Sequence, residues 1–210
     1  LIFPIGRPPR PWAQLVRPFC ERCAEPFSRS APGEFLCANC LDRHWSLDRL
    51  RASYRAVGVV RETILRFKYG REYALRPWLG RWMRDGFRQH YAGESWDALV
   101  PVPLHTERRK IRGFNQSDEI ARWLGAQVKI PVVEGLVRVR PTLSQARLKR
   151  AERLRNLRGA LDLAPGFDPR GQRLLLCDDV FTTGATADAC AKVLQKAGAA
   201  EVAALAVARG

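Results

Sequence analysis

The sequence predicts an α/β fold in which a parallel, doubly wound sheet follows a small cysteine-rich module. Three observations support this prediction. Beyond about residue 45, apolar strand-like runs alternate with helix-like segments, which is the pattern of a parallel sheet with crossover helices. Two Cys-x-x-Cys pairs lie ahead of that pattern. An apolar run at 174–177 leads into two acids and a turn rich in small and hydroxylated residues.

The composition fits one domain of ordinary size with a small appendage. The chain has 210 residues, 46% hydrophobic and 27% charged, so a packed core is expected. The formal net charge of +15 predicts attraction to polyanions such as nucleic acid, nucleotides or acidic lipid. The sequence has no apolar run of about 18 residues, so no membrane span is predicted. Residues 1–17 break early on prolines and arginines, which predicts a proline-rich lead-in and not a signal peptide.

A cysteine module is predicted over residues 18–44. Its four thiols belong to Cys20, Cys23, Cys37 and Cys40. Each pair can place two thiolates on one turn, and the two turns can close a tetrahedron around Zn²⁺. Four thiolates leave no open position, so the zinc ribbon is predicted to be structural, with metal binding supplying folding free energy. The alternative is a thiol-redox pair, which needs a βαβ context that is absent here. The spacing also favours a reducing cytoplasm over a disulfide-forming compartment.

The remaining chain, 45–210, alternates helices and strands. The predicted helices are 59–70, 74–87, 117–128 and 185–198. The predicted strands are 97–103, 131–140, 171–179 and 201–208. Residues 105–117 are predicted to be a polar, basic loop ahead of the third helix. Because ligands of such sheets bind past the carboxyl ends of the strands, the loops after residues 103, 140 and 177 are expected to converge.

The strand-to-helix turn at 178–186 has the composition of an anion site. Asp178 and Asp179 follow the apolar run, and Thr182, Thr183, Gly184, Ala185 and Thr186 lead into the last helix. Gly184 permits an unusual backbone angle, and loop amides at a helix N-terminus bind anions. Carboxylates suit hydroxyl groups or hydrated Mg²⁺, so the turn fits a ribose that carries a phosphate. The alternative is an ordinary turn in which Asp and Thr serve as caps.

The turn and three other motifs resemble a known family. The string from Asp178 to Thr186 resembles the signature of type I phosphoribosyltransferases that binds PRPP, 5-phosphoribosyl 1-pyrophosphate. The four-cysteine module, RFKYG (66–70), VPVPLH (100–105) and RGFNQS (112–117) together resemble the ComF family. This resemblance covers about residues 18–210. It implies a zinc ribbon ahead of a phosphoribosyltransferase-like domain over 45–210, with hood and flexible-loop segments near 59–90 and 138–160.

The resemblance also implies residue roles. Asp178 and Asp179 would meet the ribose hydroxyls as catalytic residues, with Mg²⁺ bound alongside PRPP. Arg108, Arg109, Lys110 and Arg112 would add positive charge near the pyrophosphate. Thr142 would belong to a flexible catalytic loop like that of the glutamine-using phosphoribosyltransferases. The residues expected to contact the PRPP phosphates are Thr182, Thr183, Gly184, Ala185, Thr186, Pro103, Leu104, Arg109, Lys110, Thr142, Gln145 and Arg153.

Two basic clusters are visible without any resemblance. Eight basic residues and a single acid, Glu152, lie between Arg138 and Arg158. This run is interpreted either as a solvated helix face or as a contact for polyphosphate or nucleic acid. The second cluster consists of Arg66, Lys68 and Arg71 around Tyr69. It either stacks a base or simply ends a helix.

Three functions remain open. The resemblance implies a cytoplasmic role in natural competence, in which single-stranded DNA is received or moved together with competence or recombination proteins. An active phosphoribosyltransferase is the second hypothesis, with positioning and electrostatics stabilising an oxocarbenium-like state. A regulator that senses PRPP without turnover is the third.

Overall fold

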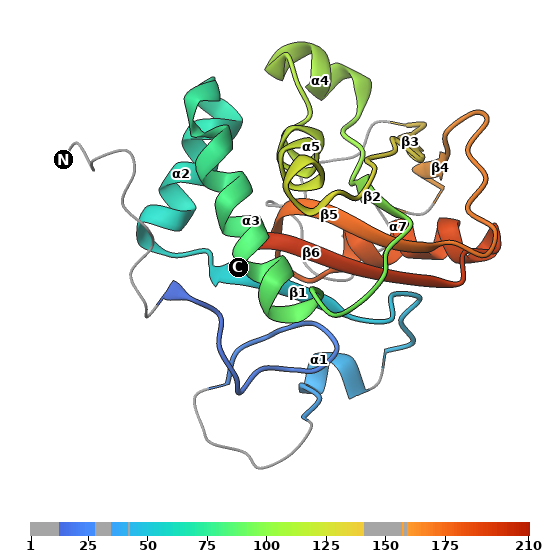
Figure 1. Ribbon diagram of the computed structural model, residues 1–210, viewed down its shortest axis with the longest axis horizontal. Coiled ribbons are helices and arrows are strands. Elements are labelled where there is room, and N and C mark those ends of the chain that lie inside the picture. Colours follow the sequence, from blue (N-terminus) through green and yellow to red (C-terminus); the bar gives the residue numbers. More distant parts are fainter. Residues whose placement is uncertain (1–12, 28–34, 42, 141–156, 158) are drawn as a thin grey trace.

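A four-stranded parallel sheet forms the centre of the molecule (Figure 1). The computed structural model describes residues 13–27, 35–41, 43–140, 157 and 159–210. In spatial order the strands are β1 (Leu50–Arg55), β6 (Glu201–Arg209), β5 (Arg173–Phe181) and β2 (Ala98–Pro101). All three neighbouring pairs are parallel, which confirms the predicted sheet.

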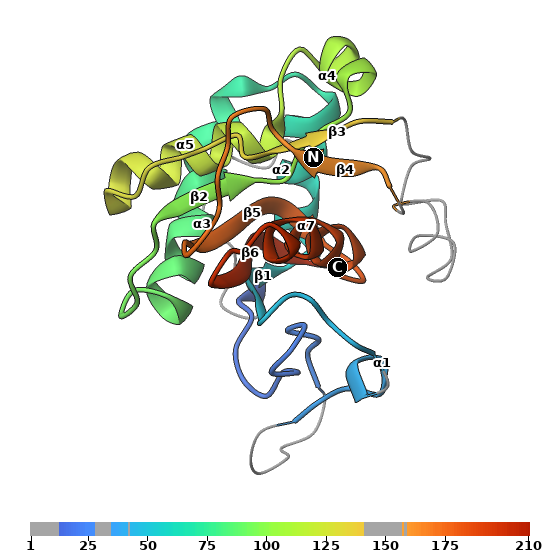
Figure 2. The ribbon, with the colours of Figure 1, turned by 90° about the vertical axis from the view of Figure 1, so that its right-hand side faces the viewer.

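Helices cover both faces of the sheet, as expected of a doubly wound fold (Figure 2). One face carries α2 (Gly58–Tyr69), the 3₁₀ turn η2 (Tyr73–Leu75), α3 (Arg76–His90) and α5 (Gln116–Val128), and the other carries α7 (Ala185–Lys196). Because side chains alternate along a strand, those of β5 point in turn to one face of the sheet and to the other. Leu175 and Cys177 pack with α3 and α5, whereas Leu174 and Leu176 pack with α7. Within the described part of the chain, no helix is long and apolar enough to cross a membrane.

The basic segment 105–117, expected to be a loop, contains a helix instead. Helix α4 (Thr106–Arg112) begins after His105, whose ring accepts a hydrogen bond from the Glu107 N–H at 3.3 Å. It ends at Gly113, which adopts a left-handed φ of 85°. None of the helix residues is buried, so the segment has no apolar period that would reveal a helix in the sequence.

The other differences concern strands. Strand β5 continues to Phe181, two residues beyond the predicted end at 179, so Asp178 and Asp179 lie within the strand. The run 131–140 contributes only β3 (Leu136–Arg138), which pairs antiparallel with β4 (Leu161–Leu163) in a separate small sheet. These two strands cover the side of the sheet that carries α7.

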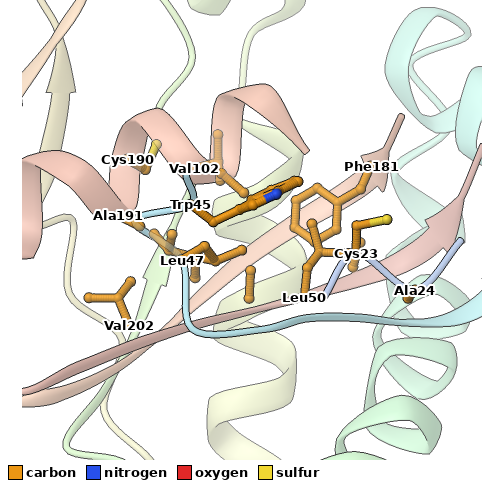
Figure 3. Close-up of a cluster of buried hydrophobic side chains, with 14 of the residues drawn as sticks. Cys23, Ala24, Trp45, Leu47, Leu50, Val102, Phe181, Cys190, Ala191 and Val202 are labelled. Atoms are coloured by element: carbon orange, nitrogen blue, oxygen red, sulfur yellow. The ribbon is translucent and has the colours of Figure 1, made fainter. Parts of the chain in front are cut away.

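The cysteine module packs directly on the α7 side of the sheet. A short helix, α1 (Ala38–Leu41), carries one of the cysteines. The four cysteines, Phe19 and Trp45 share one apolar cluster with residues of β5, β6 and α7. Figure 3 shows Trp45 beside Phe181 and Leu47 in this cluster. The Arg209 side chain donates from Nε to the Cys23 carbonyl at 3.1 Å, which ties the last strand to the module.

Candidate functional site

A pocket of about 220 Å³ opens where β5 leads into α7. We call it the strand-end pocket, and its lining residues are Lys68, Tyr69, 102–104, Arg108, Arg112, Gln116, Ser117, Arg138 and 178–186. The loops after residues 103 and 177 meet here, at the carboxyl ends of β2 and β5, as predicted. Residues 141–156, which follow the third expected loop, lie outside the described residues.

The residues of the turn into α7 line the pocket. Gly184 is the N-cap residue and has a left-handed φ of 71°. A Cβ atom at this position would lie 2.8 Å from the Trp45 ring, so both the backbone angle and the close contact require glycine. Thr183 accepts a hydrogen bond from the Ala185 N–H at 3.4 Å. Thr182 is exposed beside it. The turn therefore provides the amide and hydroxyl donors that an anion needs.

The two acids of β5 are buried and already hydrogen-bonded. Asp178 accepts from the Ser117 hydroxyl at 2.7 Å and from the Asp179 N–H at 2.9 Å. Asp179 accepts from the Val180 N–H at 2.9 Å, and its other oxygen lies 2.5 Å from Lys68 Nζ. Their side chains are therefore held in fixed directions before any ligand arrives. Such carboxylates can accept hydrogen bonds from the hydroxyl groups of a sugar.

Basic groups outnumber acids around the pocket. Lys68, Arg108, Arg112 and Arg138 face Asp178 and Asp179. Burial lowers the pKa of Lys68 to about 8, and the negative charge of Asp178 opposes that shift. Burial raises the pKa of Asp178, which Lys68 and the hydrogen bond from Ser117 oppose. This surplus of positive charge favours an anionic ligand.

The structure separates the predicted basic residues into two groups. Arg108 and Arg112, four residues apart on one face of α4, line the pocket. Arg109 instead lies 3.3 Å from Glu134 and lines a neighbouring cavity. Lys110 is exposed and outside the pocket lining. The helical period explains this division, because consecutive residues of α4 point in different directions.

The other predicted contacts divide in a similar way. Those that line the pocket are Pro103, Leu104, Asp178, Asp179, Thr182, Thr183, Gly184, Ala185 and Thr186. Thr142, Gln145 and Arg153 lie outside the described residues. Sequence reasoning did not identify Ser117 as a partner of Asp178, nor Lys68 as a partner of Asp179. The local signals for Lys68 were its position in the motif RFKYG and in the basic cluster around Tyr69.

The cysteine cluster fits a tetrahedral metal. Its four sulfur atoms are buried and all lie within 4.8 Å of one another. Cys23 Sγ and Cys37 Sγ are 3.7 Å apart. A tetrahedron with Zn–S bonds of about 2.3 Å has sulfur–sulfur edges of roughly 3.8 Å, which agrees with this distance. A hydrogen bond from Cys23 lowers the pKa of Cys20 to about 4, so the cluster favours one thiolate, at Cys20. The same hydrogen bond raises the pKa of Cys23, and burial raises the pKa of Cys40. These thiols can therefore bind a metal ion such as zinc.

Comparison with characterised sequences finds several relatives along most of the chain. Competence protein F of Haemophilus influenzae is 31% identical over 191 residues, which is 88% of this chain and 82% of that protein. DNA utilization protein YhgH of Escherichia coli is 29% identical, with 90% and 83% covered. Competence protein ComFC of Streptococcus pneumoniae is 26% identical, with 87% and 84% covered. No family model matches the chain.

Comparison with solved structures gives weaker overlap. The allosteric regulatory enzyme of purine biosynthesis superposes with a TM-score of 0.42 and 22% identity, over 62% of this chain and 25% of that one. A purine phosphoribosyltransferase of Pyrococcus horikoshii superposes with a TM-score of 0.40 and 16% identity, over 63% and 73%.

Proposed function

Because the chain belongs to the ComF family of competence proteins, we propose that it binds a phosphorylated ribose such as PRPP and supports the handling of single-stranded DNA. The observation that carries the ligand assignment is the meeting of two kinds of group in the strand-end pocket. Fixed carboxylates lie on one side and the glycine turn of α7 lies on the other. This pairing matches a sugar that carries hydroxyls on one edge and a phosphate on the other.

The proposed roles follow from the geometry. Asp178 and Asp179 accept hydrogen bonds from the ribose hydroxyls. The amides and hydroxyls of 182–186 hold the 5′-phosphate at the N-terminus of α7. Arg108 and Arg112 attract the pyrophosphate, because they reach the same pocket from α4. The oxygen ligands that Mg²⁺ requires are present in the two aspartates and in the diphosphate. When bound, Mg²⁺ would neutralise part of the diphosphate charge.

The DNA role rests on the relatives and on charge. Two of the relatives are named as competence proteins and one as a DNA utilization protein. The net charge of +15 suits a polyanionic partner. Zinc is the proposed metal of the cysteine cluster, in a structural role, since four thiolates complete its coordination. Six free cysteines suit the reducing cytoplasm, where we propose that the protein works.

Thermal unfolding in the presence of PRPP and Mg²⁺ tests the ligand assignment. A ligand at about 100 times its dissociation constant stabilises the folded state by about 2.7 kcal/mol, which raises the melting temperature by roughly 5 to 10 °C. The double variant Asp178→Asn with Asp179→Asn should lose this rise in melting temperature. Each amide has one oxygen that can accept a hydrogen bond from a ribose hydroxyl, whereas each carboxylate has two. Asp168→Asn, an exposed acid outside the pocket lining, should keep it.

Two controls make the experiment decisive. Ribose 5-phosphate without the pyrophosphate should give a smaller rise, and inorganic phosphate a smaller one still. If the double variant fails to fold, Thr183→Ala with Thr186→Ala removes hydroxyl donors from the turn and should also reduce the rise. An unchanged melting temperature for the unmodified protein, or an equal rise in the variants, would refute the assignment.

A further inference from the structure

A second hollow of about 360 Å³ lies beside the strand-end pocket. We call it the side hollow, and its lining residues are Lys68, Tyr69, Arg71, Arg108, Ile111 and Arg112. Its lining comes from the end of α2, from Arg71 just beyond it, and from helix α4. Figure 1 shows α4 projecting beyond the sheet. Lys68, Tyr69, Arg108 and Arg112 line both spaces, so the side hollow adjoins the strand-end pocket.

The lining combines positive charge with exposed apolar surface. Every charged residue of the side hollow is basic. Tyr69 is 68% exposed and Ile111 is 74% exposed, although both are large hydrophobic residues. The guanidinium of Arg112 lies over the Tyr69 ring, 5.0 Å from its centre. Tyr69 therefore does not serve the core, and one face of its ring is held next to cationic groups.

The backbone around the side hollow places Tyr69 at the surface. Helix α2 ends at Tyr69, and Arg71 adopts a left-handed φ of 54° directly afterwards. Arg71 then donates from Nη2 to the Ile111 carbonyl at 3.3 Å, which links the end of α2 to α4. Gly70 allows this turn, because a Cβ there would lie 2.7 Å from the Arg66 carbonyl oxygen. Two exposed apolar side chains, Tyr69 from α2 and Ile111 from α4, therefore line one cationic hollow.

We propose that the side hollow binds one nucleotide of single-stranded nucleic acid, next to the phosphoribosyl ligand. The base stacks on Tyr69 and contacts Ile111, and the flanking phosphates lie against Arg71 and Arg108. Proteins that bind single strands without reading their sequence use this combination of a cationic groove and aromatic platforms. The inference rests on the proposed function for the class of partner, and it adds the location and the residues.

Fluorescence anisotropy with a labelled oligothymidine tests the inference. Tyr69→Leu should weaken binding about tenfold or more, because base–aromatic stacking is lost. The slope of log affinity against log salt should not change in this variant, since no charge is removed. Arg71→Gln should weaken binding and reduce the slope by about 0.7, the value expected for one phosphate contact on a single strand. Tyr69→Trp should bind about as well as the unmodified protein, because it keeps an aromatic ring for stacking.

The matched control is Tyr73→Leu. Tyr73 is 51% exposed and lies four residues beyond Tyr69, but it packs on Phe114 and does not line the side hollow. Equal effects of Tyr69→Leu and Tyr73→Leu, or equal affinity for duplex and single strand, would overturn the inference and leave the phosphoribosyl assignment intact. An unmodified protein that binds no oligonucleotide would overturn both the inference and the DNA role. The melting-temperature rise with PRPP tests the strand-end pocket independently of either result.

Discussion

Lys68 and Asp179 form an ion pair inside a pocket that is also suited to an anionic sugar. The pair lies at 2.5 Å, and the Asp179 side chain is only 3% exposed. An isolated carboxylate so deeply buried would be costly, and the ammonium group offsets that cost. A ligand with both hydroxyls and phosphate can replace each half of the pair, giving Asp179 a hydroxyl donor and Lys68 an anion. The ion pair therefore keeps the pocket formed without a ligand.

His90 links stability to pH at a single residue. Burial and, to a smaller extent, the nearby positive charges of Arg51 and Arg17 together lower the pKa of its imidazole to about 4. The unfolded chain, with a histidine pKa near 6.5, binds the proton more readily. The contribution of neutral His90 to the free energy of unfolding is therefore complete above about pH 6.5 and is lost as the pH falls toward 4. We expect the free energy lost over this range to be about 2 kcal/mol.

His90→Gln should remove this term, because glutamine does not titrate. Denaturant unfolding of both proteins at several pH values between 7.5 and 4.5 measures it. Acid would also protonate thiolates and release a metal bound by the cysteines, so the quantity to compare is the difference in unfolding free energy between the two proteins at each pH. That difference should shift in favour of the variant as the pH falls. Parallel curves would show that His90 carries no linked proton.

At the scale of elements, Asp188 connects helix α7 to the chain that follows the cysteine module. Its Oδ1 accepts from the Ser46 N–H at 2.8 Å and from the Leu47 N–H at 3.2 Å. Its Oδ2 accepts from Arg43 at 2.7 Å, and the same guanidinium lies 3.7 Å from the centre of the Trp45 ring. One carboxylate thus holds the end of the cysteine module against α7, the helix whose N-terminus lines the strand-end pocket.

Asp188→Ala should lower the free energy of unfolding by about 2 to 4 kcal/mol, because it removes hydrogen bonds to a charged, largely buried group. Asp188→Asn is the matched variant, since it keeps one acceptor oxygen and loses the charge, and it should cost less. Denaturant unfolding of the three proteins measures the order. The interpretation fails if alanine and asparagine have the same small effect, as expected for a solvated surface pair.

Sequence patterns predicted most elements, and the exceptions have physical causes. Helices α2, α3, α5 and α7 show an apolar period because one side of each packs on the sheet. Helix α4 buries no residue and so lacks that period. Strand β1 was not predicted, because its sequence contains Arg51 and Ser53, which are buried in the fold. Arg51 is accepted there only because its guanidinium bonds to the Glu21 carboxylate and carbonyl, in a segment far away in the sequence.

The candidate site could also be predicted only in part, because some of its contacts form through tertiary packing. The acids and the glycine turn could be predicted to belong to one candidate site because they are consecutive in the sequence. Ser117 and Lys68 could not be assigned to Asp178 and Asp179, because packing of α5 and α2 on the sheet creates those contacts. The orientation of α4, which turns Arg112 to the pocket and Arg109 to Glu134, also depends on tertiary structure.

At the scale of the whole molecule, the cysteine cluster and the sheet share one core. The four cysteines belong to the apolar cluster that contains Leu50 and Phe181 of the sheet. Trp45, which follows the module, lies against Gly184 of the pocket turn. Folding of the cysteine module and folding of the pocket turn are therefore energetically connected. Loss of a metal bound by the cysteines should also destabilise residues that are not its ligands.

Metal removal should consequently destabilise the entire described fold and not the module alone. Structural zinc contributes on the order of 10 kcal/mol to small metal domains, so chelation should lower the melting temperature by roughly 10 °C or more. Calorimetry should show one transition at the lower temperature, because the shared core couples the two parts. A Cys20→Ser variant should already melt low and should show little further change with chelator. Two separate transitions, with the upper one at the original temperature and an unchanged response to PRPP, would show instead that the module folds independently of the sheet.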